Sequence, residues 1–262
     1  MRKHFFLMLK IAVFSFAVIS VAGIINYVRM PRFVLQSTLN KQAVEYEINY
    51  EVAYSSKPTE IPEIKLLDVF RSNGKTKTIT KHLKDNVIQD GSTQLYYEIP
   101  EGSFSCITPV FISDNTGAHP IGPLTCQPHS LTKDPLSNNE NVIPEDRLSL
   151  VFNHLTNENL SYLGEKEIIN RKCRLFEADV IMVESSLSEN LRYYREVYKT
   201  EPDKAEITFC LDKQTAIPLE MSIILSANTP YYGNMNTELS YKATVLNIKV
   251  DEKEFMLPDQ TI

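Results

Sequence analysis

The sequence predicts a mostly β (α+β) protein, in which an antiparallel sheet with a few helices follows one N-terminal transmembrane helix. Three observations lead to this fold class. Residues 5–28 are almost continuously apolar, several later segments alternate apolar and polar residues, and Asn73-Gly74 and Asp90-Gly91 separate such segments. Alternation is typical of strands with one buried face, and both dipeptides are common hairpin turns.

The first 32 residues are expected to form a membrane segment of their own. A helix over residues 5–28 would rise ~1.5 Å per residue to about 36 Å, which exceeds the roughly 30 Å of a hydrocarbon core. Residues 11–25 contain no polar stripe, so they lack the amphipathic pattern of a helix that packs on a soluble core. We therefore predict a transmembrane helix.

Two interpretations of this segment remain open. Basic residues at its start and the small residues Ser20-Val21-Ala22 are features of a cleaved secretory signal. The apolar run continues beyond them through Ile24 and Ile25, which favours an uncleaved signal anchor. We expect the anchor, so that the membrane is a partner of the chain through its N-terminal helix.

The charged residues divide the chain at the same place. Residues 1–32 hold five basic residues and no acidic one, so the remaining 22 basic and 33 acidic residues give residues 33–262 a net charge of −11. An acidic body excludes a nucleic-acid binder that is driven by phosphate attraction. Basic residues flank the apolar run on both sides, and their slight excess before it favours a cytoplasmic N-terminus and an extracytoplasmic main domain.

Four cysteines support that orientation: Cys106, Cys126, Cys173 and Cys210. An even number behind an export-like segment is typical of disulfides formed in an oxidising compartment. Three pairings are possible. We favour Cys106–Cys126 and Cys173–Cys210, because each pair joins near neighbours in the sequence.

A metal site is the alternative for two of these cysteines. Cys106, His119, Cys126 and His129 would make a Cys2His2 set, which zinc accepts. Their spacing matches no common zinc module, and thiolates outside the cell usually oxidise. We therefore predict no metal site.

Residues 33–262 are expected to form one extracytoplasmic domain that consists mainly of strands. The expected strands are residues 44–52, 64–70, 76–80, 85–88, 94–99, 103–107, 163–183 (strand, turn, strand), 206–211, 219–227 and 239–250. Residues 85–88 and 94–99 are expected to form a hairpin across Asp90-Gly91.

Two helices and one loop complete the expected domain. Residues 147–155 and 188–200 have apolar residues at helical spacing, which predicts helices that pack an apolar stripe on the sheet. Residues 127–147 contain three Pro and three Asn with few large apolar residues, which predicts a surface loop.

Three short motifs in the second half resemble a known group of exported proteins. Residues 164–176 match G-x-x-x-I-x-x-R-x-C-x-x-F, residues 210–219 match C-x-D-x-x-T-x-I-P-L, and residues 255–258 match F-x-L-P. Similar phrases occur in the lipoprotein-carrier-like superfamily, which includes LolA, RseB and mycobacterial lipid-binding lipoproteins. The resemblance spans about residues 40–258.

The resemblance implies a curved antiparallel sheet, a half-barrel, with helices over its concave face. Members of this superfamily hold acyl chains or bind protein partners in that cavity. A concave apolar site of this kind suits a hydrophobic ligand. The chain departs from the group in its apparent uncleaved anchor and its two disulfides.

These observations predict a membrane-anchored extracytoplasmic protein that binds a lipid or another hydrophobic ligand. An envelope sensor or protein-interaction module that uses the same half-barrel is the alternative. The sequence contains no G-x-S-x-G, H-E-x-x-H, P-loop or G-x-G-x-x-G motif. We therefore expect no enzymatic activity, no catalytic residue and no cofactor.

Overall fold

The computed structural model describes residues 30–55, 63–84, 87–88, 93–107, 111–114, 117–120, 124–128, 143–181, 204–229 and 233–258. The predicted membrane segment, apart from its last three residues, and the predicted helix at 188–200 lie outside these ranges. Within these ranges, no helix combines the length and the hydropathy that a membrane crossing requires.

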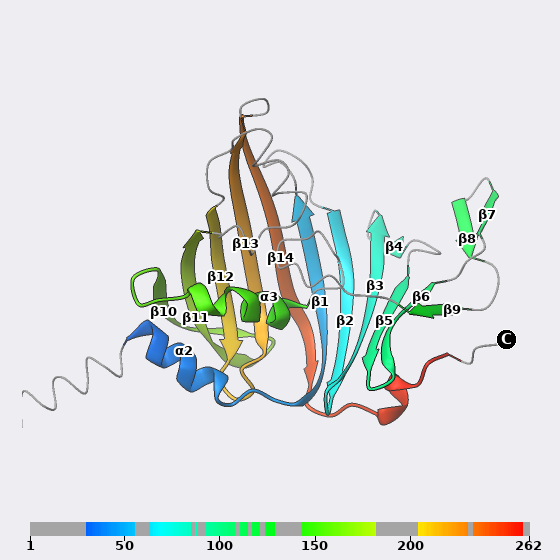
Figure 1. Ribbon diagram of the computed structural model, residues 1–262, viewed down its shortest axis with the longest axis horizontal. Coiled ribbons are helices and arrows are strands. Elements are labelled where there is room, and N and C mark those ends of the chain that lie inside the picture. Colours follow the sequence, from blue (N-terminus) through cyan, green and yellow to red (C-terminus); the bar gives the residue numbers. More distant parts are fainter. Residues whose placement is uncertain are drawn as a thin grey trace, which may run out of the picture.

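Most of the described chain forms one large antiparallel sheet, consistent with a half-barrel (Figure 1). Its strands, in spatial order, are β10 (Leu160–Ile168), β11 (Arg171–Ile181), β12 (Lys204–Asp212), β13 (Pro218–Thr229), β14 (Gly233–Asn247), β1 (Glu45–Ser55), β2 (Glu63–Ser72), β3 (Lys75–Lys84), β5 (Gln94–Ile99), β6 (Gly102–Ile107) and β9 (Thr125–Pro128). A short strand, β4 (Val87–Ile88), also pairs with β3. β7 (Phe111–Asp114) and β8 (Gly117–Pro120) pair with each other.

Two tight hairpin turns have positive φ values at both central residues, which Asn73-Gly74 favours and the β-branched Ile169 does not. Asn73 and Gly74 join β2 to β3 with φ values of 48° and 80°. Ile169 and Asn170 join β10 to β11 with φ values of 46° and 61°. Two consecutive positive φ values are what a type I′ turn requires, and such turns match the twist of antiparallel strands.

One expected hairpin is wrong. β5 pairs with β3 and β6, whereas β4 pairs with the last residues of β3. The reason is the length of β3, because residues 76–80 pair with β5 while Leu83 and Lys84 pair with β4. Both segments therefore lie along the same edge of one long strand, and they do not form a hairpin with each other.

The described helices are short. They are α2 (Pro31–Leu39), α3 (Pro144–Val151) and two 3-10 helices, η1 (Phe152–His154) and η3 (Glu252–Phe255). The helix expected at 147–155 begins three residues earlier, with Pro144 in its first turn together with Glu145 and Asp146. Proline and acidic residues favour a helix N-terminus. The expected loop at 127–147 thus ends in a helix and begins in β9, and residues 129–142 lie outside the described ranges.

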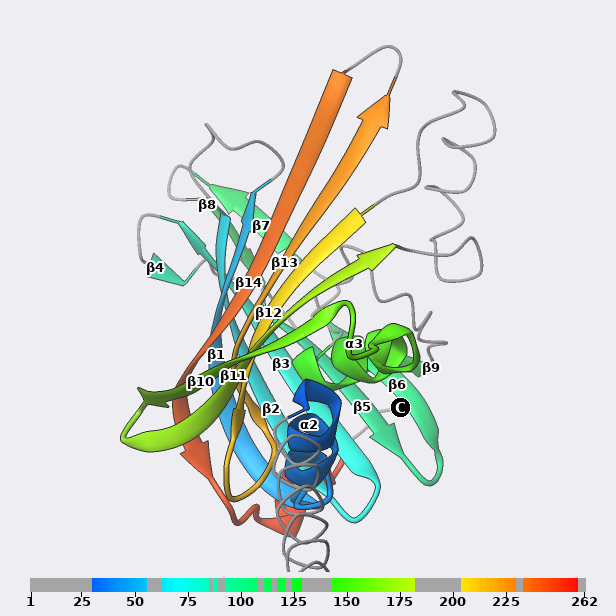
Figure 2. The same cartoon turned by 90° about the vertical axis from the view of Figure 1, so that its left-hand side faces the viewer.

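Both α2 and α3 lie on the same face of the sheet, which twists and curves about them (Figure 2). We call this the inner face. From β11 to β2 the buried apolar side chains point to it. They include Tyr46, Ile48, Tyr50, Leu67, Val69, Phe176, Ala178, Ile207, Phe209, Leu219, Met221, Ile223, Tyr241 and Ala243. This cluster is the main core of the domain.

From β3 to β9 the buried face changes. Thr78 and Thr80 occupy inner positions on β3, whereas Lys77 and the neighbouring Tyr97 on β5 point to the outer face. Tyr97 is only 2% exposed and lies close to η3, whose Glu254 binds Lys77. Strand β3 therefore buries side chains on both faces, and beyond it the most buried residues, Tyr97 and Cys106, lie on the outer face.

Candidate ligand-binding site

The four cysteines form the two disulfides that the sequence favoured, Cys106–Cys126 and Cys173–Cys210. The first joins directly opposed residues of β6 and β9, and the second joins β11 to β12. Because Cys106 and Cys126 are bonded to each other, neither supplies the thiolate that the alternative metal site would need. Both disulfides lie on the outer face, away from α2 and α3.

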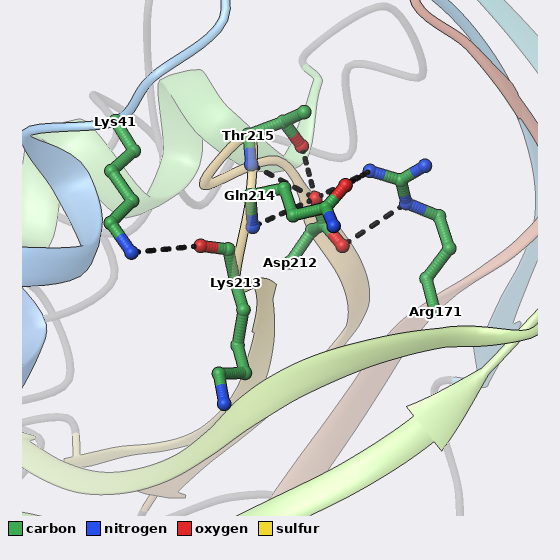
Figure 3. A network of polar contacts seen from close by, with 6 residues as sticks. All are labelled: Lys41, Arg171, Asp212, Lys213, Gln214 and Thr215. Carbon is green, nitrogen blue, oxygen red and sulfur yellow. Dashed lines mark hydrogen bonds and ion pairs between the residues drawn. The ribbon is translucent and has the colours of Figure 1, made fainter.

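The turn between β12 and β13 is organised around the carboxylate of Asp212 (Figure 3). Arg171 donates to both carboxylate oxygens, at 3.1 Å from Nε and 2.8 Å from Nη2. The backbone N–H groups of Gln214 and Thr215 donate to Oδ2 at 3.2 and 2.9 Å, and the Thr215 hydroxyl donates at 2.6 Å. These contacts explain why the Asp and Thr stand at their positions in the motif of residues 210–219.

The Asp212 turn also fixes the chain that leaves α2. Lys41 donates from Nζ to the carbonyl of Lys213, and the N–H of Ala43 donates to the carbonyl of Thr215. Burial would raise the pKa of the Asp212 carboxyl, but the hydrogen bonds from Arg171 and Thr215 outweigh it and lower that pKa. With its oxygens occupied by the protein's own donors, Asp212 acts as a structural support.

Helix α2 is fastened to the inner face by one arginine of β11. Arg174 Nη1 donates to the hydroxyls of Ser37 and Thr38, at 3.1 and 2.8 Å. It also approaches the carbonyl of Val34, in the first half of the helix, at 3.4 Å. Leu35 is fully buried beneath the helix. α2 therefore covers the β10–β11 end of the apolar inner face.

Helix α3 is held over the middle of the inner face by polar contacts of Glu145 and Arg147. The Tyr46 hydroxyl and Arg71 Nη1 both donate to Glu145 Oε2, the latter at 3.0 Å. Two residues further along the helix, Arg147 Nε donates to the Tyr241 hydroxyl at 2.7 Å. Glu145 and Arg147 are both nearly fully buried, so these contacts lie within the protein.

Burial dominates the ionisation of these groups. It raises the pKa of Tyr241 above the usual phenol value and that of Tyr46 well above it. The nearby Glu145 raises the pKa of Tyr46 further. Burial also raises the pKa of Glu145, against the opposing effects of Tyr46 and Arg71. Glu145 Oε1 is buried and has no hydrogen-bond partner among the described residues. Burial of the Glu145 carboxylate is therefore costly, and its hydrogen bonds with Tyr46 and Arg71 fix the position of α3 on the sheet.

Residues in the described part of the chain line two cavities beside α3. The first, which we call the strand cavity, has a volume of about 210 Å³ and is lined by Val52, Tyr54, Glu63, Lys65, Leu67, Thr80, Arg147, Leu239 and Tyr241. The second, the helix cavity, has a volume of about 200 Å³ and is lined by Leu39, Gln42, Glu145, Leu148, Ser149, Phe152, Ala216 and Pro218. The Asp212 turn supports the wall of the helix cavity at Ala216 and Pro218. Helix α3 thus lies between the strand cavity and the helix cavity and contributes residues to both.

The sequence did not single out the charged residues of this site. Lys65 and Arg71 stand on β2 at alternate positions with Leu67 and Val69, so all four point to the same face. The alternation of these two cations with Leu67 and Val69 can be read from the sequence. It is a signal, because a cation at the buried positions of a strand is unusual. The positions of Glu145 and Arg147 over those cations depend on tertiary packing, and no local pattern predicts them.

No family model matches the chain, and no curated protein matches its sequence. Solved structures resemble it distantly. LprF from Mycobacterium bovis is 11% identical with a TM-score of 0.39, and the match covers 84% of this chain and 96% of that one. The lipoprotein LppX from Mycobacterium tuberculosis is 9% identical with a TM-score of 0.36, covering 83% of this chain and 94% of that one.

A LolA superfamily protein from Nitrosomonas europaea is 8% identical with a TM-score of 0.35, and the match covers 87% of this chain and 98% of that one. Of these three structures, one is described as a member of the LolA superfamily and one as a lipoprotein.

Proposed function

We propose that this chain is a membrane-anchored extracytoplasmic protein that binds a lipid or another hydrophobic ligand on the inner face of a half-barrel. One observation carries the proposal. Among the residues that the structure describes, two cavities of about 200 Å³ each lie beside α3, next to the apolar inner face. Concave, mostly apolar space with a few polar groups is typical of ligand sites.

The proposal places residues 1–32 in the membrane as a signal anchor and residues 33–262 outside the cytoplasm. The two disulfides support this placement, because such bonds persist in oxidising compartments. A net charge of −11 on residues 33–262 would repel an anionic bilayer, so the anchor would hold the domain near its ligand source.

Native mass spectrometry of the full-length chain, extracted in a mild non-ionic detergent, tests the ligand. We expect an adduct with the mass of a lipid. Leu239→Trp should fill part of the strand cavity and reduce the lipid-bound fraction. Leu163→Trp, at an exposed position on β10, is the matched control and should leave that fraction unchanged.

A bare chain in these spectra would contradict the ligand proposal. Chemical crosslinking in intact membranes then distinguishes the second candidate function. A stable protein partner without any bound lipid would favour the sensor or protein-interaction module. We expect no enzymatic activity and no nucleic-acid partner in either case.

A further inference from the structure

We propose that the start of α2 and the turn of residues 156–159 form a surface that lies in the head-group layer of the membrane that holds residues 5–28. We call this surface, residues 30–33 and 156–159, the contact surface. The inference rests on the proposed function, which anchors the chain in a bilayer, and it adds which side of the domain faces that bilayer.

The chain between the predicted membrane helix and α2 is very short. The apolar run ends at Val28, and α2 begins at Pro31 with Met30 as its N-cap. One residue of extended chain spans at most ~3.6 Å, so Met30 lies within about 7 Å of the end of that run. The head-group layer on each side of a hydrocarbon core is about 5–8 Å thick. An anchor over residues 5–28 therefore holds the start of α2 at this layer.

The exposed side chains of α2 suit that position. Met30 is 40% exposed and Phe33 is 37% exposed, whereas Leu35, on the opposite side of the helix from Phe33, is fully buried. Further along the helix the exposed residues include Gln36 and Asn40, which are polar. The exposed side chains thus change from apolar to polar with distance from the predicted membrane helix. Aromatic and apolar side chains are favourable at a membrane interface, where they leave water.

A second segment extends the surface beyond the sequence neighbourhood of the anchor. The backbone N–H of Arg32 donates to Asn157 Oδ1 at 3.1 Å. The turn around Asn157 is closed by Asn159, whose Oδ1 accepts from the N–H of Thr156 at 2.6 Å. Thr156, Asn157 and Glu158 are exposed. The start of α2 therefore brings a turn from the middle of the sequence to the same side of the domain.

The charge of the contact surface differs from that of the domain. Its charged residues are Arg32 and Glu158, so its formal net charge is zero, whereas residues 33–262 carry −11. Anionic head groups repel an acidic surface and attract a basic residue close to them. A neutral surface with one exposed arginine avoids the repulsion that most of the domain would meet at such a membrane.

The contact surface lies at one end of the long axis of the domain. The start of α2 is at the left margin of the described chain beside β10, whereas η3 lies on the right-hand side (Figure 1). The β10–β11 end of the sheet would therefore face the membrane, and η3 would face away from it. The last residue of α2, Leu39, lines the helix cavity, and a helix of nine residues is about 13 Å long. α2 thus connects the head-group layer to the helix cavity.

Tryptophan fluorescence tests the inference, because the chain has no Trp of its own. Single-Trp variants of the full-length chain are placed in vesicles of phosphatidylcholine with a smaller share of phosphatidylglycerol. Phosphatidylcholine brominated near the head group then quenches any Trp that lies against it. Phe33→Trp and Glu158→Trp report on the two segments of the contact surface. Met256→Trp, at an exposed position that ends η3, is the matched control.

We expect brominated lipid to remove about half of the fluorescence of Phe33→Trp and Glu158→Trp but less than about a tenth of that of Met256→Trp, because a Trp at the interface lies next to the acyl chains. All three substituted positions are exposed, so the substitutions leave the core intact. Glu158→Trp is the decisive variant, since its position is far from the anchor in the sequence and reaches the bilayer only through the fold.

Two outcomes would overturn the inference while leaving the anchor intact. One is an unquenched Glu158→Trp variant in a chain that floats with the vesicles. The other is equal quenching of all three variants, because no particular side of the domain would then face the bilayer. A chain that does not float with the vesicles would instead contradict the membrane anchoring in the proposed function itself.

Discussion

The two halves of the sheet are both antiparallel but place their large buried side chains differently. In the half from β10 to β2, large apolar residues occupy the inner face, and α2 and α3 pack on them. In the half from β3 to β9, threonine and serine occupy many inner positions, and the aromatic residues Tyr97 and Phe104 point outward. The C-terminal η3 lies against that outer face through Glu254 and Phe255.

The difference shows how one sheet supports both a core and a candidate site. A strand alternates its side chains, so exchanging the apolar and polar positions moves the buried face from one side to the other. The exchange occurs between β2 and β3, beneath the strand cavity. Lys65 and Thr80 are the polar side chains that this transition brings to the inner face beside Leu67.

The largest expected difference concerns the aromatic residues of the two halves. Phe209 is 1% exposed and its ring stacks on Phe176 at a centroid distance of 5.3 Å. Phe209→Ala should lower the free energy of unfolding by about 3–5 kcal/mol. Phe104→Ala, at a half-buried outer position, should lower it by roughly 1 kcal/mol.

Urea unfolding of the full-length chain in detergent, followed by tyrosine fluorescence, measures both values. The chain has 13 Tyr and no Trp, so this signal needs no added label. Equal losses from the two variants would show that the outer face of the second half is as important a core as the inner face of the first.

An intermediate effect is expected at the Asp212 turn, which stabilises the first half. Asp212→Asn should lower the free energy of unfolding at pH 7 by about 2 kcal/mol, because it removes charge-assisted hydrogen bonds. The lowered pKa of Asp212 means that this stabilisation is complete above the ordinary carboxyl pKa of about 3.9. It is lost as the pH falls from there through the folded-state pKa.

Urea midpoints at pH 7 and pH 3 measure this dependence, and Asp179→Asn, at an exposed position on β11, is the control. The difference between wild type and Asp212→Asn should shrink at pH 3. A difference that is the same at both pH values would contradict the assigned role of the carboxylate.

The smallest effect is expected for the ion pair that holds η3 on the second half. Lys77 Nζ lies 2.7 Å from Glu254 Oε2 and also over the rings of Phe70 and Tyr97. Glu254→Gln should lower the free energy of unfolding by less than about 1 kcal/mol, because Glu254 is 40% exposed. The aromatic contacts of Lys77 do not depend on this carboxylate.

The comparison of urea midpoints at low salt and in 1 M NaCl tests this prediction. Salt should reduce the difference between wild type and variant, since it screens exposed charges. A loss above 2 kcal/mol that salt does not change would show that η3 is a more important cover than its exposure suggests.

Much of the sheet was predictable because its signals are local. The alternation over residues 44–52 predicted β1, and Asn73-Gly74 predicted the turn between β2 and β3. The hairpin between β4 and β5 was predicted wrongly, because the dipeptide Asp90-Gly91 does not indicate that both segments pair with β3 instead of with each other. The start of α3 was missed although Pro144 and two acidic residues marked it.

The sequence by itself determined most of the long strands, the Asn73-Gly74 turn and the favoured disulfide pairs, because these depend mainly on near neighbours in the chain. It also determined the division into a basic, apolar head and an acidic body. Only the tertiary structure decided where each half buries its large side chains and placed Arg147 of α3 near Lys65 of β2. The physical reason is sequence distance: the strand cavity joins residues of β1, β2 and β3 with residues of β14 and α3, and the pairing of β1 with β14 brings the two ends of the chain together.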